Sequence, residues 1–354
     1  MTATTSTLDH VLREVAANAA AIDAGTATPV AHLRALAAAG LLDQGIDDLL
    51  TGSPRSLDLR PSATTIASLA EECLSTAFGT WAHRVVEDYL ARGRRTPATE
   101  ATLARLRTAD AVGSTGMAQA LKALAGIGEL GIEAVKDGDE YVLSGSVVWI
   151  SNLVDDAILV LPARTADGGG IVVWTPYPAP GLTSRHVTGL LALDATASGS
   201  LTIDGLRIPA DQVLTTDLAS FVRAVKPTFL VLQTSFAAGL IRRSWAEIER
   251  SLDRAENAAF GADAAEVASV VEDFLGRWLL AASDVGAPSI VELIQLRLDA
   301  CHLAQRVTRL ELTLAGGRGY VATSAANRRF REAAFLPVQS PSEGHLKWEL
   351  SSLA

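Results

Sequence analysis

The stretch from residue 136 to residue 152 constrains the fold of this chain most, because it combines two turn signals with two short apolar runs. Asp137 and Gly138 form a hairpin signal, since glycine readily adopts the positive φ that such a turn needs. We expect a short strand over residues 141–143, a second turn at Ser144 and Gly145, and another strand over residues 147–150. The pattern predicts a hairpin segment in the middle of the chain.

The second of these strands ends in Trp149, Ile150 and Ser151, which place a large aromatic ring beside a hydroxyl group. A flat ring system such as a flavin can lie against the tryptophan while the Ser151 hydroxyl and backbone N–H groups meet its polar edge. The alternative is a hairpin whose tryptophan belongs to the hydrophobic core, as most buried aromatic side chains do. The local sequence alone favours the core interpretation.

Helices are predicted before this stretch. Apolar residues recur at helical spacing from about residue 8 to residue 110, and Gly40 is expected to end one of these helices. The clearest helical pattern covers residues 63–90, with Gly79 as a candidate break. This pattern indicates an N-terminal helical domain.

Between residue 111 and about residue 215, glycine and β-branched residues increase and apolar residues alternate with a period of two. The candidate strands in this segment, besides those of the hairpin, are residues 157–161, 171–174, 190–193 and 200–203. A turn and an edge strand closed by Pro209 follow the last of them. Short strands at this spacing suggest a small antiparallel barrel or sandwich.

The helical period returns from about residue 220, and four long helices are predicted there, which imply a bundle. We therefore expect a mainly α protein with a central antiparallel β domain. Its three parts are an N-terminal helical domain (1–110), a middle β domain (111–219) and a C-terminal four-helix bundle (220–354).

Composition and charge exclude several classes of function. The 354 residues carry a net charge of −10, which argues against binding to nucleic acid or to an anionic membrane surface. No stretch of about eighteen uncharged apolar residues is visible, so we expect no membrane span. The two cysteines, Cys73 and Cys301, belong to no CxxC pair, which predicts neither a disulfide framework nor a metal site. Residues 1–10 show no signal-peptide pattern, and the expected location is the cytoplasm.

The order of helices, β segment and helical bundle resembles the acyl-CoA dehydrogenase family over nearly the whole chain. Residues 136–152 are similar to the family segment in which a Trp-Ile-Thr/Ser tripeptide meets the flavin ring, and residues 203–214 to the closing strand of its middle domain. The run from Gly316 to Tyr320, followed by residues 331–333, resembles the Gly-Gly-x-Gly-Tyr and Arg-Asp-Ala pattern of the last helices. Together, and in this order, the three stretches are specific for the fold.

The resemblance implies a flavin cofactor, FAD with FMN as the alternative. Trp149, Ile150 and Ser151 fall on the tripeptide, whose hydroxyl lies near flavin N5 in the family. Thr115 and Met117 lie in a loop that matches the family loosely, and they are candidates for a further contact with the ring.

Family members also approach the FAD of a neighbouring subunit through glycines near the end of the bundle. In this sequence those residues are Gly316, Gly317 and Gly319. The resemblance therefore implies a homodimer or a homotetramer with shared cofactor sites.

A catalytic glutamate that removes a substrate α-proton is a further feature of the family. Counted from Arg331, its usual position is Ser340; in some members it lies early in the first bundle helix, which is near Thr228 here. Neither position holds a carboxylate, and a serine hydroxyl without a partner base is a poor proton acceptor. Glu343, slightly further along, is the candidate catalytic residue if the loop is rearranged.

Three functions stay open on the sequence alone. The first is a flavin-dependent dehydrogenase for a small-molecule substrate, with an acyl-CoA as the expected substrate and a separate electron acceptor. The second is a monooxygenase on the same fold, which receives reduced flavin from a flavin reductase and needs no glutamate. The third is a degenerate, non-catalytic paralogue that acts by assembly or ligand binding. The first is the commonest use of the fold.

Overall fold

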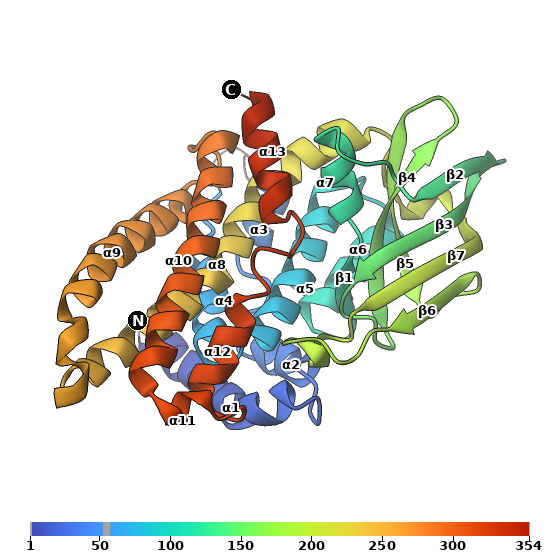
Figure 1. Ribbon diagram of the computed structural model, residues 1–354. Coiled ribbons are helices and arrows are strands. Elements are labelled where there is room, and N and C mark those ends of the chain that lie inside the picture. The colour runs from blue at the N-terminus through green and yellow to red at the C-terminus, as the bar shows by residue number, and fades with distance from the viewer. Residues whose placement is uncertain (1, 52–56, 354) are drawn as a thin grey trace.

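The computed structural model describes residues 2–51 and 57–353, with side chains described from residue 7 onward. Helices fill one side of the molecule and a twisted sheet forms the other, with the last helix, α13, standing beside α7 and α8 (Figure 1). The predicted fold class, mainly helical with a central β part, is confirmed.

The helices that precede the sheet pack around α5. They are α1 (Thr2–Asp23), α2 (Val30–Ala38), α3 (Ile46–Thr51), α4 (Arg60–Glu72), α5 (Leu74–Arg92) and α6 (Pro97–Arg107). The candidate break at Gly79 is wrong, because Gly79 lies inside α5 and the chain breaks instead at Cys73, which is extended (φ −159°, ψ 112°). The residues of α5 are buried from Leu74 to Leu90, so this helix has protein on all sides.

The described chain forms one eight-stranded sheet in the order β6-β7-β3-β2-β4-β5-β8, with β1 beside β4. Its strands are β1 (Val112–Thr115), β2 (Ile132–Asp137), β3 (Glu140–Ile150), β4 (Ala157–Thr165), β5 (Gly170–Tyr177), β6 (Leu182–His186), β7 (Gly199–Ile208) and β8 (Val213–Thr215), with helix α7 (Ala118–Leu124) after β1. Both β1 and β2 run parallel to β4, so the sheet is mixed rather than wholly antiparallel. A hairpin turn joins antiparallel strands only, and neither β1 nor β2 is joined to β4 by a hairpin. Local turn signals could therefore not predict that these strands run parallel to β4.

The hairpin prediction needs one correction. The turn at Gly138 is confirmed, with φ +62°, but Ser144 and Gly145 form no turn and β3 continues through them. Gly145 has φ +140°, and a Cβ there would lie 2.0 Å from the carbonyl oxygen of Gly131. The glycine therefore serves an irregularity in the ladder between β3 and β7, where the register shifts between Leu143 and Gly145.

The strand predicted at residues 190–193 is wrong, and β6 at residues 182–186 was missed. The Asp194 carboxylate accepts hydrogen bonds from the backbone N–H groups of Gly189 and Leu190, both at 2.9 Å. These bonds turn the chain, and Leu193 takes φ +67° before the short 3-10 helix η1 (Asp194–Thr196). The result is a loop that reaches from the sheet toward the helices.

The C-terminal helices are α8 (Leu218–Leu252), α9 (Gly261–Ser283), α10 (Ile290–Ala315), α11 (Gly317–Tyr320), α12 (Ala325–Ala333) and α13 (Glu343–Leu353). The predicted fourth long helix is divided, since α12 ends at Ala333 and α13 begins at Glu343. Pro337 and Pro341 lie between the two, and proline interrupts helical hydrogen bonding. The segment between α12 and α13 therefore crosses the bundle as a loop.

One hydrophobic core joins the N-terminal helices to the bundle, and a second lies within the sheet. Helix α8 is long and apolar enough to cross a membrane by length and composition, but 89% of its most apolar window is buried inside the protein, as in a core helix. The sheet begins with β1 at Val112, and the C-terminal helices begin with α8 at Leu218, near the predicted boundaries at residues 110 and 219. The division of the chain into three domains stays a prediction.

Candidate functional site

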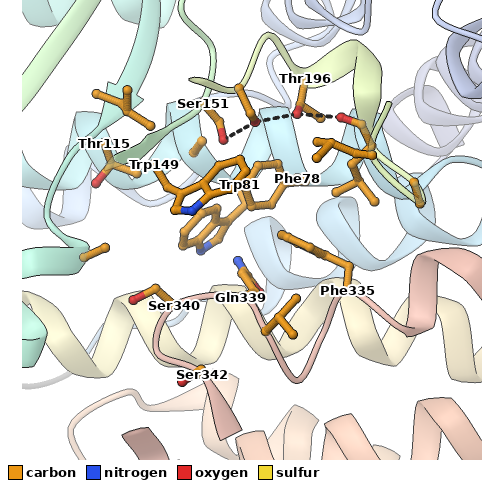
Figure 2. A pocket seen from close by; sticks show the side chains of 18 of the residues that line it. Phe78, Trp81, Thr115, Trp149, Ser151, Thr196, Phe335, Gln339, Ser340 and Ser342 are labelled. Atoms are coloured by element: carbon orange, nitrogen blue, oxygen red, sulfur yellow. Dashed lines mark hydrogen bonds between the residues drawn. The ribbon is translucent and has the colours of Figure 1, made fainter. Parts of the chain in front are cut away.

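A cavity of about 650 Å³ lies where the end of β3 meets α5, α8 and the segment after α12. This volume is typical of pockets that hold small molecules and cofactors. Figure 2 shows Trp149 and Ser151 on one side of the cavity and Gln339, Ser340 and Ser342 on the other. The full lining is Phe78, Trp81, Ala82, Thr115, Ala118, Lys122, Trp149, Ile150, Ser151, Leu190, Leu191, Ala192, Leu193, Thr196, Ser198, Phe229, Arg331, Ala334, Phe335, Val338, Gln339, Ser340 and Ser342.

The end of β3 supplies the residues that the sequence singled out. Successive side chains of a strand point to opposite faces, so Ile150 is 2% exposed in the core while Trp149 is 54% exposed. The ladder between β3 and β7 shifts register between Val147 and Ile150. Such irregularities re-aim side chains beside functional sites. Trp149 is therefore a cavity residue and not a core residue.

Ser151 belongs to a line of hydroxyl groups along one wall (Figure 2). Its Oγ lies 2.7 Å from Ser198 Oγ, which lies 2.8 Å from Thr196 Oγ1, and the Thr196 hydroxyl donates to the carbonyl oxygen of Leu193 at 2.8 Å. Each hydroxyl has one proton, and a carbonyl accepts only. When all three bonds are formed, Thr196 donates to Leu193, Ser198 to Thr196 and Ser151 to Ser198. The oxygen of Ser151 is then left as an acceptor toward the cavity.

Aromatic rings from α5, from α8 and from the turn after α12 form the apolar wall. Trp81 is stacked on Phe78 with ring centroids 5.4 Å apart and meets Phe229 edge-on at 4.9 Å, and Phe335 meets Phe78 edge-on at 5.3 Å. Trp81 is 3% exposed, yet no described residue accepts a hydrogen bond from its indole nitrogen. Buried N–H groups normally have a partner, so this donor is available to a ligand.

The opposite wall carries two more polar atoms of this kind. The amide nitrogen of Gln339, a residue that is 6% exposed, and the hydroxyl of Ser340 are both buried without a partner among the described residues. Ser340 occupies the position where the family resemblance puts the catalytic glutamate, and it does line the cavity. Thr228 does not, and its hydroxyl accepts instead from Arg92.

The charged residues of the lining are basic. Arg331 is held by Asp23, at 2.5 Å, and donates to the carbonyl oxygen of Leu191. Lys122 lies on α7 at the rim. Among the described residues that line the cavity, none is aspartate, glutamate or histidine. The lining therefore offers no proton acceptor of the usual catalytic types.

Glu343, the candidate catalytic residue, is engaged elsewhere. It lies in the first turn of α13, where its carboxylate accepts from Lys347 and from His302 at 3.1 Å. These hydrogen bonds hold the pKa of Glu343 below its ordinary value. The side chain is thus ionised, paired and absent from the cavity lining, although neighbouring Ser342 is part of it.

Of the remaining predicted contacts, Thr115 lines this cavity and the others do not. Thr115, at the end of β1, lines it, whereas Met117 is 1% exposed and lies in the core. Gly316, Gly317 and Gly319 lie at the start of α11, outside the lining. Gly316 has φ +59°, which ends α10, so this position favours glycine for a local reason. A role of these glycines toward another subunit stays a prediction.

Sequence reasoning missed the aromatic wall and the Gln339 side of the cavity. Trp81 falls within the helical pattern predicted over residues 63–90, where an aromatic residue at helical spacing usually belongs to the core. Phe335 and Gln339 follow the stretch at residues 331–333 that carries the family resemblance, and no motif marked them. Within the described chain, no group of three or more His, Cys, Asp or Glu side chains is placed to hold a metal ion.

Comparison with known proteins places this architecture among acyl-CoA dehydrogenases. No protein-family model matches the chain. The chain is 25% identical over 345 residues to the mitochondrial short-chain specific acyl-CoA dehydrogenase of Homo sapiens, covering 92% of this chain and 82% of that protein. The corresponding enzyme of Bos taurus is 29% identical over 214 residues, covering 56% of this chain and 52% of that protein, about half its length. The butyryl-CoA dehydrogenase structure from Megasphaera elsdenii matches with a TM-score of 0.86 and 17% identity, covering 100% of this chain and 98% of that one.

The fold and these relatives define a flavoprotein oxidoreductase as the general kind of protein. In sequence and in fold the chain is similar to the acyl-CoA dehydrogenase family. The residues on the β3 side of the cavity fit the flavin that this similarity implies, because the exposed ring of Trp149 offers a flat aromatic surface beside the Ser151 hydroxyl, and the buried indole N–H of Trp81 is an unpaired donor. A planar heterocycle with polar atoms at its edge suits these groups.

Proposed function

We propose that this chain is a flavin-dependent oxidoreductase that binds the flavin ring against Trp149, Ile150 and Ser151 and acts on an acyl thioester in the same cavity. One observation carries the proposal. The tripeptide that the family resemblance assigns to the flavin lies on the rim of a cavity of about 650 Å³ between sheet and bundle. Bound there, the flavin supplies hydride or electron transfer, while the protein contributes position and polarity.

Each wall has a separate role in this proposal. The rings of Trp81 and Phe229 exclude water from the reacting part of the substrate, and the polar edge near Ser151 orients the cofactor. Lys122 and Arg331 give the lining a basic character that favours an anionic thioester. The substrate then lies between the β3 side and the Gln339 side of the cavity.

Two reactions are possible on this scaffold: monooxygenation with reduced flavin and oxygen, and α,β-dehydrogenation of the thioester with oxidised flavin. Two observations favour monooxygenation. α,β-Dehydrogenation requires a group that accepts the α-proton, and none of the described lining residues carries a carboxylate or an imidazole. In addition, Ser151 faces the cavity as an acceptor. N5 of an oxidised flavin accepts a hydrogen bond, whereas N5 of a reduced flavin donates one. The hydroxyl line ending at Leu193 therefore favours the reduced form.

The second candidate is dehydrogenation of an acyl-CoA, which the relatives named above support. In that case the proton acceptor lies outside the described lining. Glu343 is the nearest candidate in the sequence, and it must first leave Lys347 and His302. This candidate would also require a separate electron acceptor, whereas the reduced-flavin reaction would require a flavin reductase and oxygen.

An anaerobic titration distinguishes these candidates. Purified protein is titrated with oxidised FAD, with FMN and with dithionite-reduced FAD, and the oxidised complex is then mixed with butyryl-CoA. Tighter binding of reduced flavin, with no bleaching by butyryl-CoA, supports the reduced-flavin reaction. Bleaching of bound FAD by the thioester supports dehydrogenation. If neither flavin form binds, the proposed function is wrong and the non-catalytic alternative takes its place.

A Thr196→Val variant tests the hydroxyl line itself. Removal of the Thr196 hydroxyl frees the Ser198 proton to turn toward Ser151, so Ser151 can donate to the cavity. We expect the preference for reduced over oxidised FAD to decrease about tenfold, the effect of one hydrogen bond of about 1.5 kcal/mol. An unchanged preference would show that the direction of this line does not affect the flavin.

A further inference from the structure

The wall that faces Trp149 is organised by a buried arginine that the proposed reaction does not use. Arg297, on α10, is fully buried and donates to Gln233 Oε1 at 2.9 Å, to Gln339 Oε1 at 3.0 Å and to the carbonyl oxygen of Leu336 at 3.1 Å. It also donates to the thiol of Cys301, and its Cζ lies over the ring of Phe236, 5.9 Å from the centroid. All four hydrogen-bond partners are neutral acceptors.

The guanidinium fixes which way each glutamine amide points. A guanidinium has donors only, so the oxygen of each amide must face Arg297 and the nitrogen must face away. The Gln233 nitrogen donates to the carbonyl oxygen of Ser340 at 2.9 Å. The Gln339 nitrogen is directed toward Trp81 in the cavity, where no described residue accepts from it (Figure 2). Arg297 and Gln233 therefore clamp the segment that carries Gln339 and Ser340.

The charge of Arg297 has no counter-ion in the described part of the chain. No carboxylate lies within ion-pair distance of it in residues 2–51 and 57–353, although arginine stays charged in proteins. A buried charge without a counter-ion loses its hydration and gains no ion pair in return, which destabilises the folded state. Burial accordingly lowers the pKa of the Arg297 guanidinium. An anion in the adjacent cavity would offset this positive charge.

We propose that Gln339 Nε2 and Ser340 Oγ form a subsite for a carboxylate or similar oxyanion at the end of a short acyl chain, with Arg297 as the positioning residue behind them. The two donors are unpaired, and no acidic residue among the described lining competes for them. Hydrogen bonds to a charged acceptor are roughly twice as strong as those to a neutral one. The subsite rests on the proposed function, since it assumes that an acyl thioester enters this cavity.

The test compares two thioesters with the same number of acyl carbons. Butyryl-CoA and succinyl-CoA are titrated separately into the purified full-length protein by calorimetry, with and without flavin. The wild type is expected to bind succinyl-CoA about tenfold or more tightly than butyryl-CoA, the effect of hydrogen bonds to a charged group.

A Gln339→Glu variant removes the donor and adds a negative charge while it keeps a partner for Arg297. In this variant the preference for succinyl-CoA is expected to disappear or invert, and in Ser340→Ala it is expected to decrease. Gln212→Glu is the matched control, because Gln212 lies on the short 3-10 helix η2 (Ala210–Gln212), outside the lining, and should keep the wild-type preference. Thermal unfolding confirms that each variant is folded.

The outcomes separate the subsite from the proposed function. Equal binding of both thioesters by the wild type, or an unchanged preference in Gln339→Glu, overturns the subsite and leaves the proposed function standing. Failure of both thioesters to bind overturns the acyl ligand class and the subsite with it, while flavin binding is judged separately by absorbance.

Discussion

Gly239, near the middle of α8, allows a close approach between α8 and α4, and a Gly239→Ala substitution tests the packing. A Cβ at this position would lie 2.1 Å from the carbonyl oxygen of Ala67 and 2.7 Å from the Cβ of Ala70, both on α4. Ordinary van der Waals contact begins at 3.4 Å, so α8 and α4 would have to separate by more than an ångström.

Two opposing effects determine the size of the change. Forcing an extra carbon into a packed core costs about 1–3 kcal/mol, and the upper end applies here because the obstacle is backbone. Alanine is favoured over glycine inside a helix by about 1 kcal/mol. The expected net loss in the free energy of unfolding is therefore about 2 kcal/mol.

Gly276→Ala is the matched control. Gly276 also lies inside a helix, α9, but a Cβ there meets no atom within 4 Å. Only the helix preference acts, so this variant should be more stable than the wild type by about 1 kcal/mol. Urea unfolding followed by circular dichroism measures both variants under one set of conditions. Equal effects at Gly239 and Gly276 would refute the close packing of α8 on α4.

Three other predictions concern the site and its surroundings. Ser340→Glu restores a carboxylate at the position that the family resemblance indicates. The rate at which butyryl-CoA bleaches bound FAD under anaerobic conditions should then rise about a hundredfold, the low end of general-base catalysis. Ser342→Glu, on the same wall, should not change this rate. Trp149→Ala should weaken flavin binding, measured by absorbance titration, by about three- to tenfold, the contribution of one aromatic contact; unchanged affinity would remove Trp149 from the site. Burial lowers the pKa of His345 from 6.5 to about 4, so the unfolded chain takes up the proton first. Stability should therefore be full above pH 6.5 and fall by up to about 3 kcal/mol as the pH approaches 4. Urea unfolding at several pH values should show that the free energy of unfolding of His345→Gln depends less on pH than that of the wild type. The same pH dependence in both proteins would contradict His345 as the cause of the loss.

Periodic patterns predicted most of the fold because they reflect which faces are buried. The long helices α8, α9 and α10 and the turn at Gly138 follow directly from helical spacing and from a single glycine. The errors arose where side chains or distant backbone control the local conformation. Gly145 takes its positive φ within a strand beside Gly131, and Asp194 turns the segment that reads as a strand at residues 190–193.

The candidate site was predictable only on the side that carries a recognisable motif. Trp149 and Ser151 stand in a short stretch whose turn signals and strand pattern mark its end. The opposite wall depends on Arg297, whose hydrogen bonds orient Gln233 and Gln339 across positions far apart in the chain. No spacing rule relates a buried arginine on one helix to an amide in a later loop. The direction in which the Ser151 hydroxyl donates likewise depends on Thr196, through Ser198, and only the folded chain brings these hydroxyl groups together.

The central claim is that a flavin binds at the Trp149 side of the cavity, and tryptophan fluorescence measures this most directly. Trp81 and Trp149 both line the cavity, so a bound flavin should quench their emission. Titration of the wild-type protein with oxidised and reduced FAD is expected to give saturable quenching by both forms, tighter for the reduced form, and weaker binding to Trp149→Ala. Absence of saturable quenching and of any change in the flavin spectrum, for both redox forms, would contradict the assignment of this cavity as a flavin site.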